Sequence, residues 1–211
     1  MNATLRVTAQ NGLDQLTVAA VAAELNVTSP AVYHHVPGGK RGLTDLVVQS
    51  VVANILQPAF EERPGDDWLD RLERAILTIS AAARRYPGVM SHLVTTGRDS
   101  DESMRGAEFV LHQLEAGGFV GTARTSAFDA VNALVTGWTV TSRPSAEAAA
   151  TAGYSALAAT SSDPRKADDE GLRTALHALL RGLQSDPGKG DPPGPGTSSG
   201  PRRRRRSSAD R

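Results

Sequence analysis

Apolar residues recur at intervals of three and four along most of this chain, which is the spacing of one buried face of an α-helix. No segment alternates apolar and polar residues in the way that predicts a strand. Glycine and proline stand where the helical spacing stops. The pattern therefore predicts an all-α fold, with helices over 3–11, 40–56, 69–85, 104–116, 122–141, 145–160 and 168–184 and two short helices between 17 and 36.

The two short helices begin and end with specific signals. Thr17 can cap the first, and Asn26 and Val27 form a short turn after it. Thr28 can cap the second, with Pro30 in its first turn, where a missing N–H is tolerated. The apolar positions that should face inward are Val18, Val21, Ala22 and Leu25 in the first helix, and Val32 and Val36 in the second. This arrangement predicts a helix-turn-helix.

The second short helix carries the candidate recognition residues. With Val32 and Val36 turned inward, its exposed and flanking faces present Ser29, Ala31, Tyr33, His34 and His35. Two helices joined by such a turn fit the major groove of DNA. The alternative is an amphipathic helical hairpin inside an all-α core, with Tyr33 as a half-buried packing residue.

The pattern of residues 3–56 resembles the DNA-binding head of the TetR family of one-component transcriptional repressors. The ordered set that carries the resemblance is Thr17, Ala22, Leu25, Val27, Tyr33, His35 and Lys40. The resemblance implies a helix-turn-helix DNA-binding domain over 1–57 and a helical ligand-binding and dimerisation domain over 58–185. It implies a homodimer on a palindromic operator in double-stranded DNA, released by a small-molecule effector.

By this resemblance, bases are read by Thr28, Ser29, Ala31 and His34, near Pro30 at the start of the same helix. Phosphates are held by Thr17, Tyr33, His35 and Lys40. No Arg, Asn or Gln lies on this helix, so discrimination should depend on His34, on methyl contacts and on DNA shape. The segments 122–141 and 168–184 match the family's dimerisation helices, and the alternative is an ordinary monomeric core.

Two features depart from the family. The helix over 3–11 is about half the usual length, as if its first part were missing, and it ends at Gly12, a residue suited to a left-handed C′ position. Three residues, 37–39, precede Lys40 where two are usual. The helix over 40–56 is expected to connect head and body through Leu43, Leu46, Val47, Val51 and Ile55, and Pro58 and 63–66 are expected to break the chain.

The net charge of zero hides an uneven distribution. Residues 1–57 carry three basic and three acidic side chains, residues 58–185 carry 13 and 17, and residues 186–211 carry seven and three. A neutral DNA-binding head is unexpected, because phosphate neutralisation supplies most non-specific affinity. The tail 186–211 is rich in Pro, Gly and Ser, contains an arginine run at 202–206, and is expected to be disordered. That run either contacts nucleic-acid phosphates or is a solvated tail without a role.

The sequence contains no pattern typical of catalysis. It has no cysteine, no nucleophile elbow, no P-loop, and five histidines at no metal-ligand spacing, so we expect no enzyme, cofactor or metal site. No leader or membrane segment is visible, and a cytoplasmic protein is expected. A ligand pocket is expected among residues that also suit a core: Met90, His92, Met104, Phe109, His112, Phe128 and Trp138. Two other functions remain open: a dimeric helical interaction module whose head does not read DNA, and a weak enzyme.

Overall fold

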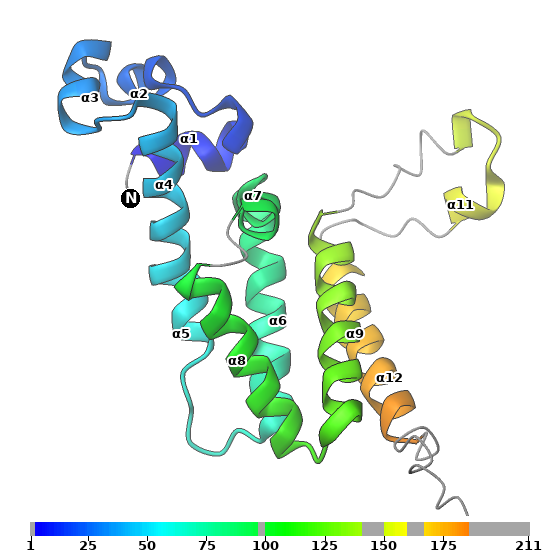
Figure 1. Ribbon diagram of the computed structural model, residues 1–211. Coiled ribbons are helices and arrows are strands. Elements are labelled where there is room, and N and C mark those ends of the chain that lie inside the picture. Colours follow the sequence, from blue (N-terminus) through cyan, green and yellow to red (C-terminus); the bar gives the residue numbers. More distant parts are fainter. Residues whose placement is uncertain (1–2, 97–99, 141–149, 160–166, 186–211) are drawn as a thin grey trace, which may run out of the picture.

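The computed structural model describes residues 3–96, 100–140, 150–159 and 167–185, and these ranges are helical (Figure 1). A small head stands at one end of a helical body, as the prediction of an all-α fold with an N-terminal helix-turn-helix requires. The head contains α1 (Ala3–Asn11), a 3₁₀ turn (Leu13–Gln15), α2 (Val18–Leu25), α3 (Ser29–His35) and the first turns of α4 (Gly39–Val51). The body contains α6 (Trp68–Arg85), α7 (Val89–Thr96), α8 (Asp101–Ala116), α9 (Gly121–Val140) and α12 (Ala167–Gln184).

The predicted turn between α2 and α3 is present in atomic detail. The Thr17 hydroxyl accepts a hydrogen bond from the amide of Ala20 at 3.1 Å and caps α2. Asn26 adopts a left-handed conformation with φ 54°, and the amide of Val27 then donates to the carbonyl of Ala22 at 2.9 Å. This closes the C-terminus of α2 and sets the direction of α3.

Two predictions about these helices are wrong. Thr28 occupies the N-cap position of α3, but its side chain makes no capping hydrogen bond. Leu25 is 49% exposed rather than inward-facing. It lies in the last turn of α2, and the chain leaves the core immediately after it.

The first helix ends as expected at Gly12, whose φ of 81° places it in the region that favours glycine. The 3₁₀ turn that follows is not visible in the apolar pattern. It joins the head to the body, because the amide of Leu13 donates to the carbonyl of Pro87 at 2.8 Å. Pro87 lies in the turn between α6 and α7.

The connector, which is the segment over 40–56 expected to join head and body, is not one uniform helix. Leu43, Val47 and Val51 are fully buried as predicted, whereas Leu46 is 39% exposed, so its predicted inward position is wrong. After Val51 the helix widens into a π-helical segment, Val52–Leu56, and continues as α5 (Gln57–Ala59). Pro58 therefore lies inside a helical run instead of ending it, which corrects the prediction of a break there.

The π segment fits the chemistry of Pro58. In a regular α-helix the proline ring clashes with the carbonyl four residues earlier, here that of Asn54, and no N–H is available to that carbonyl. Bonds from residue i to i−5 widen the turn, and the amide of Gln57 makes such a bond to Val52. The Asn54 side chain also bonds the carbonyl of Ser50 at 2.8 Å.

The body helices follow the predicted pattern with local shifts. Asp67 and Asp70 form a capping box at the start of α6, which ends at Tyr86. Ser100 caps α8, so the helix begins inside the predicted loop 97–103, of which 97–99 lie outside the described residues. Of the predicted helix 145–160, the structure describes only 150–159, including α11 (Ser155–Ala159). The predicted disordered tail, 186–211, also lies outside.

Two apolar cores hold the described chain together. The first joins α1 to α4 through Leu16, Val21, Val32 and Leu43, and it continues into Ala82, Tyr86 and Val89 of the body. The second lies between α6, α8, α9 and α12, and its fully buried members include Leu72, Leu114, Leu172 and Leu176. Because the first core reaches into α6 and α7, the division at 57/58 stays a prediction.

No helix in the described ranges combines the length and hydropathy needed to cross a bilayer.

Candidate nucleic-acid interface and cavity

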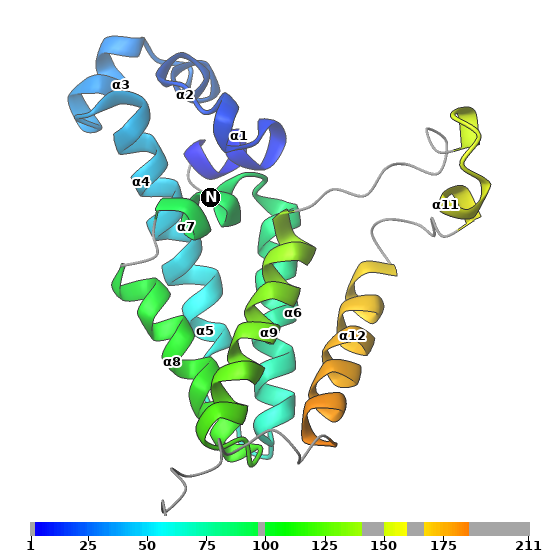
Figure 2. The ribbon, with the colours of Figure 1, turned by 45° about the vertical axis from the view of Figure 1, so that its right-hand side comes forward.

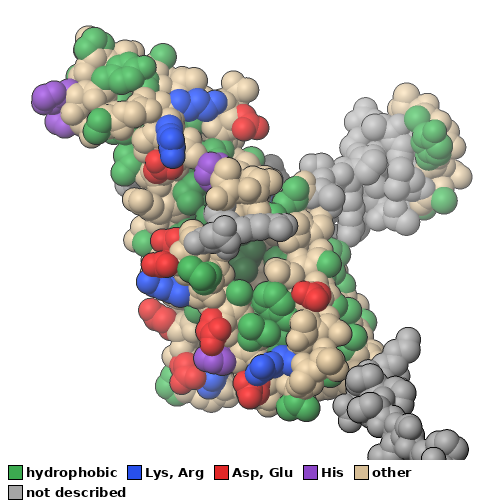
Figure 3. Space-filling view, viewed as in Figure 1, with side chains coloured by type: hydrophobic (Ala, Val, Ile, Leu, Met, Phe, Trp, Pro, Cys, Tyr) green, Lys and Arg blue, Asp and Glu red, His purple; other side chains and the backbone are tan. Residues whose placement is uncertain are grey.

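The outer surface of the head is formed by α3 and the residues on either side of it. Tyr33 is 55% exposed, and its ring lies over the backbone of Gly39, where an added Cβ would be 3.2 Å from the ring. The rings of His34 and His35 meet edge to face with centroids 5.4 Å apart. Figure 3 shows the histidine side chains protruding at the α3 end of the molecule. The end of α3 therefore presents three polar aromatic side chains.

The structure brings the nine predicted DNA-contact residues to this end of the head. They come from the start of α2, from α3 and its N-cap, and from the start of α4. The half-buried ones are Ser29 and Ala31, and the exposed ones are Thr17, Thr28, Pro30, Tyr33, His34, His35 and Lys40. Their contacts with DNA remain a prediction.

The basic side chains of the head also make contacts within it. The ammonium of Lys40 donates to the carbonyl of Asp14 at 2.7 Å and so holds the start of α4 against the 3₁₀ turn. The guanidinium of Arg6 pairs with Glu24 at 2.5 Å, linking α1 to α2. Both contacts brace the helix-turn-helix, and the ion pair with Glu24 offsets the positive charge of Arg6.

Gly42 sets how closely α4 approaches the turn after α3. A Cβ at this position would stand 2.6 Å from the carbonyl oxygen of Pro37 and 3.0 Å from Val36. We expect Gly42→Ala to destabilise the protein by about 1–3 kcal/mol, because backbone atoms must move to make room. Gly106→Ala is the control, since Gly106 is also helical and its nearest contact would be an ordinary 3.8 Å. Equal melting temperatures for the two variants would contradict the expectation.

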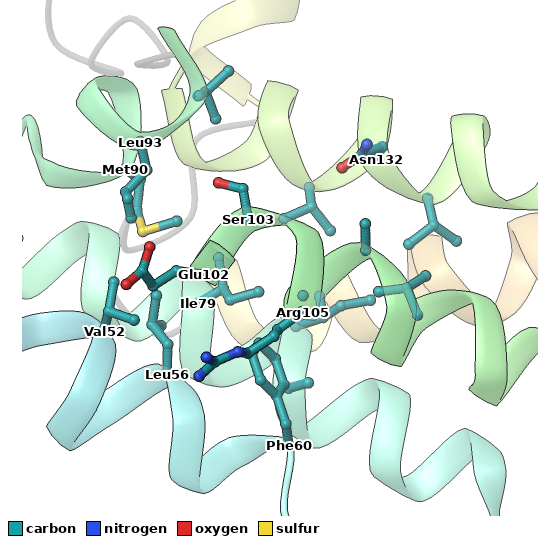
Figure 4. Close-up of a pocket in the computed structure, with 18 of the residues that line it drawn as sticks. Val52, Leu56, Phe60, Ile79, Met90, Leu93, Glu102, Ser103, Arg105 and Asn132 are labelled. Atoms are coloured by element: carbon teal, nitrogen blue, oxygen red, sulfur yellow. The ribbon is translucent and has the colours of Figure 1, made fainter. Parts of the chain in front are cut away.

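A cavity of about 740 Å³ lies beside the connector, in the body. Aliphatic side chains from the π segment, α6, α7, α8 and α9 make most of its wall, including Val52, Leu56, Ile79, Met90 and Leu93 (Figure 4). The other lining residues are Gln57, Phe60, Glu61, Ala75, Ile76, Val94, Glu102, Ser103, Arg105, Gly106, Ala107, Val110, Phe128, Val131, Asn132, Val135 and Thr136. An apolar space of this size with a few polar groups suits a small organic molecule.

Of the seven residues predicted to line a pocket, Met90 and Phe128 line this cavity. The other five lie elsewhere. Phe109 stacks on Phe60 with centroids 4.9 Å apart, Met104 is 53% exposed, and His112 pairs with Glu108 at 3.2 Å on the surface. Trp138 packs in the second core, and its ring would be 3.2 Å from a Cβ added to Gly171 of α12. His92 is half-buried in α7.

A half-buried arginine fixes the loop beside the cavity. Arg74 donates to the carbonyl of Glu61 at 2.8 Å and pairs with Asp66, so it holds both ends of the 61–66 loop against α6. Burial lowers the pKa of the Arg74 guanidinium, and the nearby charge of Arg63 acts in the same direction. The preceding residue of α6, Glu73, accepts a bond from Arg173 at 2.6 Å and pairs with His177 at 2.9 Å, which joins α12 to α6. The hydrogen bond and charge of Glu73 raise the pKa of Arg173.

Comparison with known proteins agrees with this architecture. Residues 1–45 match the family described as bacterial regulatory proteins, tetR family. The match covers the head of the chain, from α1 into α4. None of the proteins with curated descriptions matches it.

Solved structures of proteins described as TetR or TetR family share the fold over most of this chain. The TetR-Q116A protein of Acinetobacter baumannii AYE, in complex with minocycline, is 23% identical with a TM-score of 0.57, covering 87% of this chain and 93% of that one. ActR of Streptomyces coelicolor, in complex with (S)-DNPA, is 22% identical with a TM-score of 0.57, covering 88% and 95%. A possible TetR family transcriptional regulator from Streptomyces coelicolor A3(2) is 20% identical with a TM-score of 0.61, covering 87% and 96%.

The match of residues 1–45 supports a DNA-binding head of the kind found in bacterial regulatory proteins of the tetR family. The connector residues Val52, Leu56 and Phe60 are among the cavity-lining residues that sequence reasoning missed. A signal was available, because Val52 and Leu56 are apolar and one turn apart but fall outside the stripe of Leu43, Val47 and Val51. A second apolar face on one helix indicates a second packing surface.

Proposed function

We propose that this protein is a DNA-binding transcriptional regulator, namely a ligand-responsive repressor that binds a palindromic operator as a homodimer and is released by a small molecule. The observation that carries the proposal is the position of the cavity. Its wall includes Val52 and Leu56 of the π segment, which continues directly from α4 of the head. A ligand that contacts these side chains can change the position of the head without touching DNA.

In this proposal α3 enters the major groove, and two heads occupy successive grooves about one helical turn apart. Thr28, Ser29, Ala31 and His34, with Pro30 beside them, face the bases. Thr17, Tyr33, His35 and Lys40 hold phosphates on either side. Lys40 has three donors, and one of them already bonds Asp14, so it can contact a phosphate while it still braces α4.

The flank formed by α9 and α12 supports the proposed dimer. The two helices lie side by side on one side of the body in both views (Figures 1 and 2). Exposed positions on this flank include small side chains, namely Ala133, Thr174, Ala178 and Gly182. Small side chains let helices of two copies approach closely and pack into a four-helix bundle.

The effector is expected to be a mainly apolar organic molecule. Related structures contain minocycline, (S)-DNPA and actinorhodin, and these compounds are the first members of the panel we would test. A ligand shifts the equilibrium between two arrangements only by its difference in affinity for them. The effector must therefore bind more tightly when the heads no longer fit the operator.

The test uses a variant that fills the cavity. Ala107→Trp places an indole in the lining, whereas Ala123→Trp adds the same group to an exposed position of α9. For a compound that releases the wild type from its operator, we expect release to be lost in Ala107→Trp and kept in Ala123→Trp. Equal release from both variants would overturn the cavity as the effector site.

The π segment gives a separate prediction about coupling. Pro58→Ala removes the clash that favours the wider turn, so the connector should return to α-helical bonding and turn Leu56 and Phe60 relative to the cavity. We expect the operator affinity of the variant without effector to stay within about twofold of the wild-type value. The effector concentration that releases half of the protein from the operator should differ from the wild-type value by at least about fivefold. Titrations of operator complexes measure both. An unchanged half-release concentration would contradict the role of the π segment.

A further inference from the structure

Arg105 is a charged residue of the cavity wall that takes no part in holding the described fold together. It lies in the second turn of α8 and lines the cavity, although it is exposed. It is therefore placed where the cavity meets solvent. Its guanidinium makes no hydrogen bond or ion pair with any residue that the structure describes. By contrast, Arg74 beside the same cavity bonds Glu61 and Asp66.

The guanidinium of Arg105 points from α8 toward the connector. Figure 4 shows it reaching toward the side chains of Leu56, in the π segment, and Phe60, which follows α5. Phe60 packs on α8 at this level, because a Cβ added to Gly106 would be 3.8 Å from its ring and the ring stacks on Phe109. Neither an aliphatic nor a phenyl side chain offers an acceptor, whereas a guanidinium carries only donors.

Two acidic residues line the same cavity, and their places in the chain account for them. Glu102 lies in the first turn of α8, where the helix dipole favours a carboxylate, and Figure 4 shows it beside Met90. Glu61 is exposed in the loop that Arg74 holds through the Glu61 carbonyl. Neither carboxylate pairs with Arg105. Since both residues are exposed, salt screens their repulsion of an anion that binds nearby.

An anion at Arg105 would satisfy donors that the neighbouring side chains leave free. The guanidinium presents paired N–H groups in the geometry of a carboxylate or a similar oxyanion. Most of the remaining cavity wall is aliphatic, so it suits an apolar body. An amphipathic acid, with its body in the cavity and its anion at Arg105, complements both parts of the wall.

We propose that the effector is an apolar organic acid whose anionic group is held by Arg105. This inference rests on the proposed function, since it takes the cavity as the effector site, and it adds the chemical class of the effector. Because Arg105 belongs to α8 and points toward Leu56 and Phe60, the bound acid would link α8 to the connector. A neutral molecule of the same shape would fill the cavity without forming that link.

Two fluorescent probes that share one ring system and differ by an acidic group test the proposal. Anilinonaphthalenesulfonate is an anion, and phenylnaphthylamine lacks the sulfonate. Both are titrated into the full chain, into Arg105→Gln, and into Arg41→Gln, which makes the same charge change at an exposed position of the head. We expect Arg105→Gln to weaken the sulfonate at least about tenfold, as for loss of a hydrogen bond to a charged group. The neutral probe should change by less than about twofold, and Arg41→Gln should leave both affinities unchanged.

The cavity-filling variant separates failure of this proposal from failure of the proposed function. Ala107→Trp should weaken both probes, because its indole occupies their site. If both probes bind Ala107→Trp as they bind the wild type, the cavity does not hold such molecules, and the proposed effector site fails with the acid. If Ala107→Trp weakens both but Arg105→Gln affects them equally or not at all, the acid is overturned and the cavity remains. Weakening of the neutral probe alone by Ala107→Trp would also overturn the acid.

Discussion

Tyr33→Ala is expected to lower the affinity of the protein for every duplex by about a hundredfold. A hydrogen bond to a charged phosphate contributes about 1.5 kcal/mol or more, and the proposed dimer would lose two such bonds, or about 3 kcal/mol. The loss should be similar for the operator and for an unrelated sequence, because phosphate contacts carry no base information. Parallel titrations of both duplexes measure it.

Two further variants separate the contribution of the Tyr33 hydroxyl from the contribution of base recognition. Tyr33→Phe keeps the ring that lies over Gly39 and removes only the hydroxyl, so it should lose most of the same affinity. His34→Ala should instead reduce the preference for the operator, by about 1–3 kcal/mol for each good base contact. If Tyr33→Ala changed which sequence is preferred, the division between phosphate and base contacts would be wrong.

Leu43→Ala is expected to destabilise the head by about 3 kcal/mol, within the range of 2–5 kcal/mol for a fully buried leucine. Leu43 is 0% exposed and lies in the core that joins α4 to α1 and α2. Loss of its side chain leaves a cavity at the point where the connector supports the helix-turn-helix. Denaturant unfolding should show a lower midpoint, and duplex binding should weaken with it.

Leu46→Ala is the matched control on the same helix. Leu46 is 39% exposed, and surface substitutions of this kind usually change stability by no more than about 0.5 kcal/mol. Both variants replace leucine by alanine in a helix, so their difference reports burial alone. Equal destabilisation by the two would mean that α4 is packed in another register.

The parts of the fold that sequence could predict are those with local causes. The cap at Thr17, the left-handed residue at Gly12 and the ends of α6 each follow from a side chain or backbone preference within a few residues. The head could also be recognised, because its pattern of capping, apolar and aromatic residues occurs at fixed spacing. Periodicity then placed Leu43, Val47 and Val51 in the core.

The parts that sequence did not predict depend on distant neighbours. Leu25 and Leu46 fit the apolar stripes of their helices, yet no helix covers them in the described structure. Pro58 signals a break, but the widened turn before it lets the helix continue. The cavity was expected among aromatic and sulfur-containing residues, whereas aliphatic side chains from five elements form most of its wall. Periodicity shows that a face is buried but not what it is buried against.

The most direct test of the central claim is binding of the full chain to DNA from upstream of its own coding region, with an unrelated duplex as competitor. The account predicts a cooperative complex that survives a large excess of competitor, and this preference should weaken in His34→Ala. Equal affinity for both duplexes, unchanged by Tyr33→Ala and lost with the arginine run, would contradict it. The head would then not read DNA, and a dimeric interaction module would be the better description.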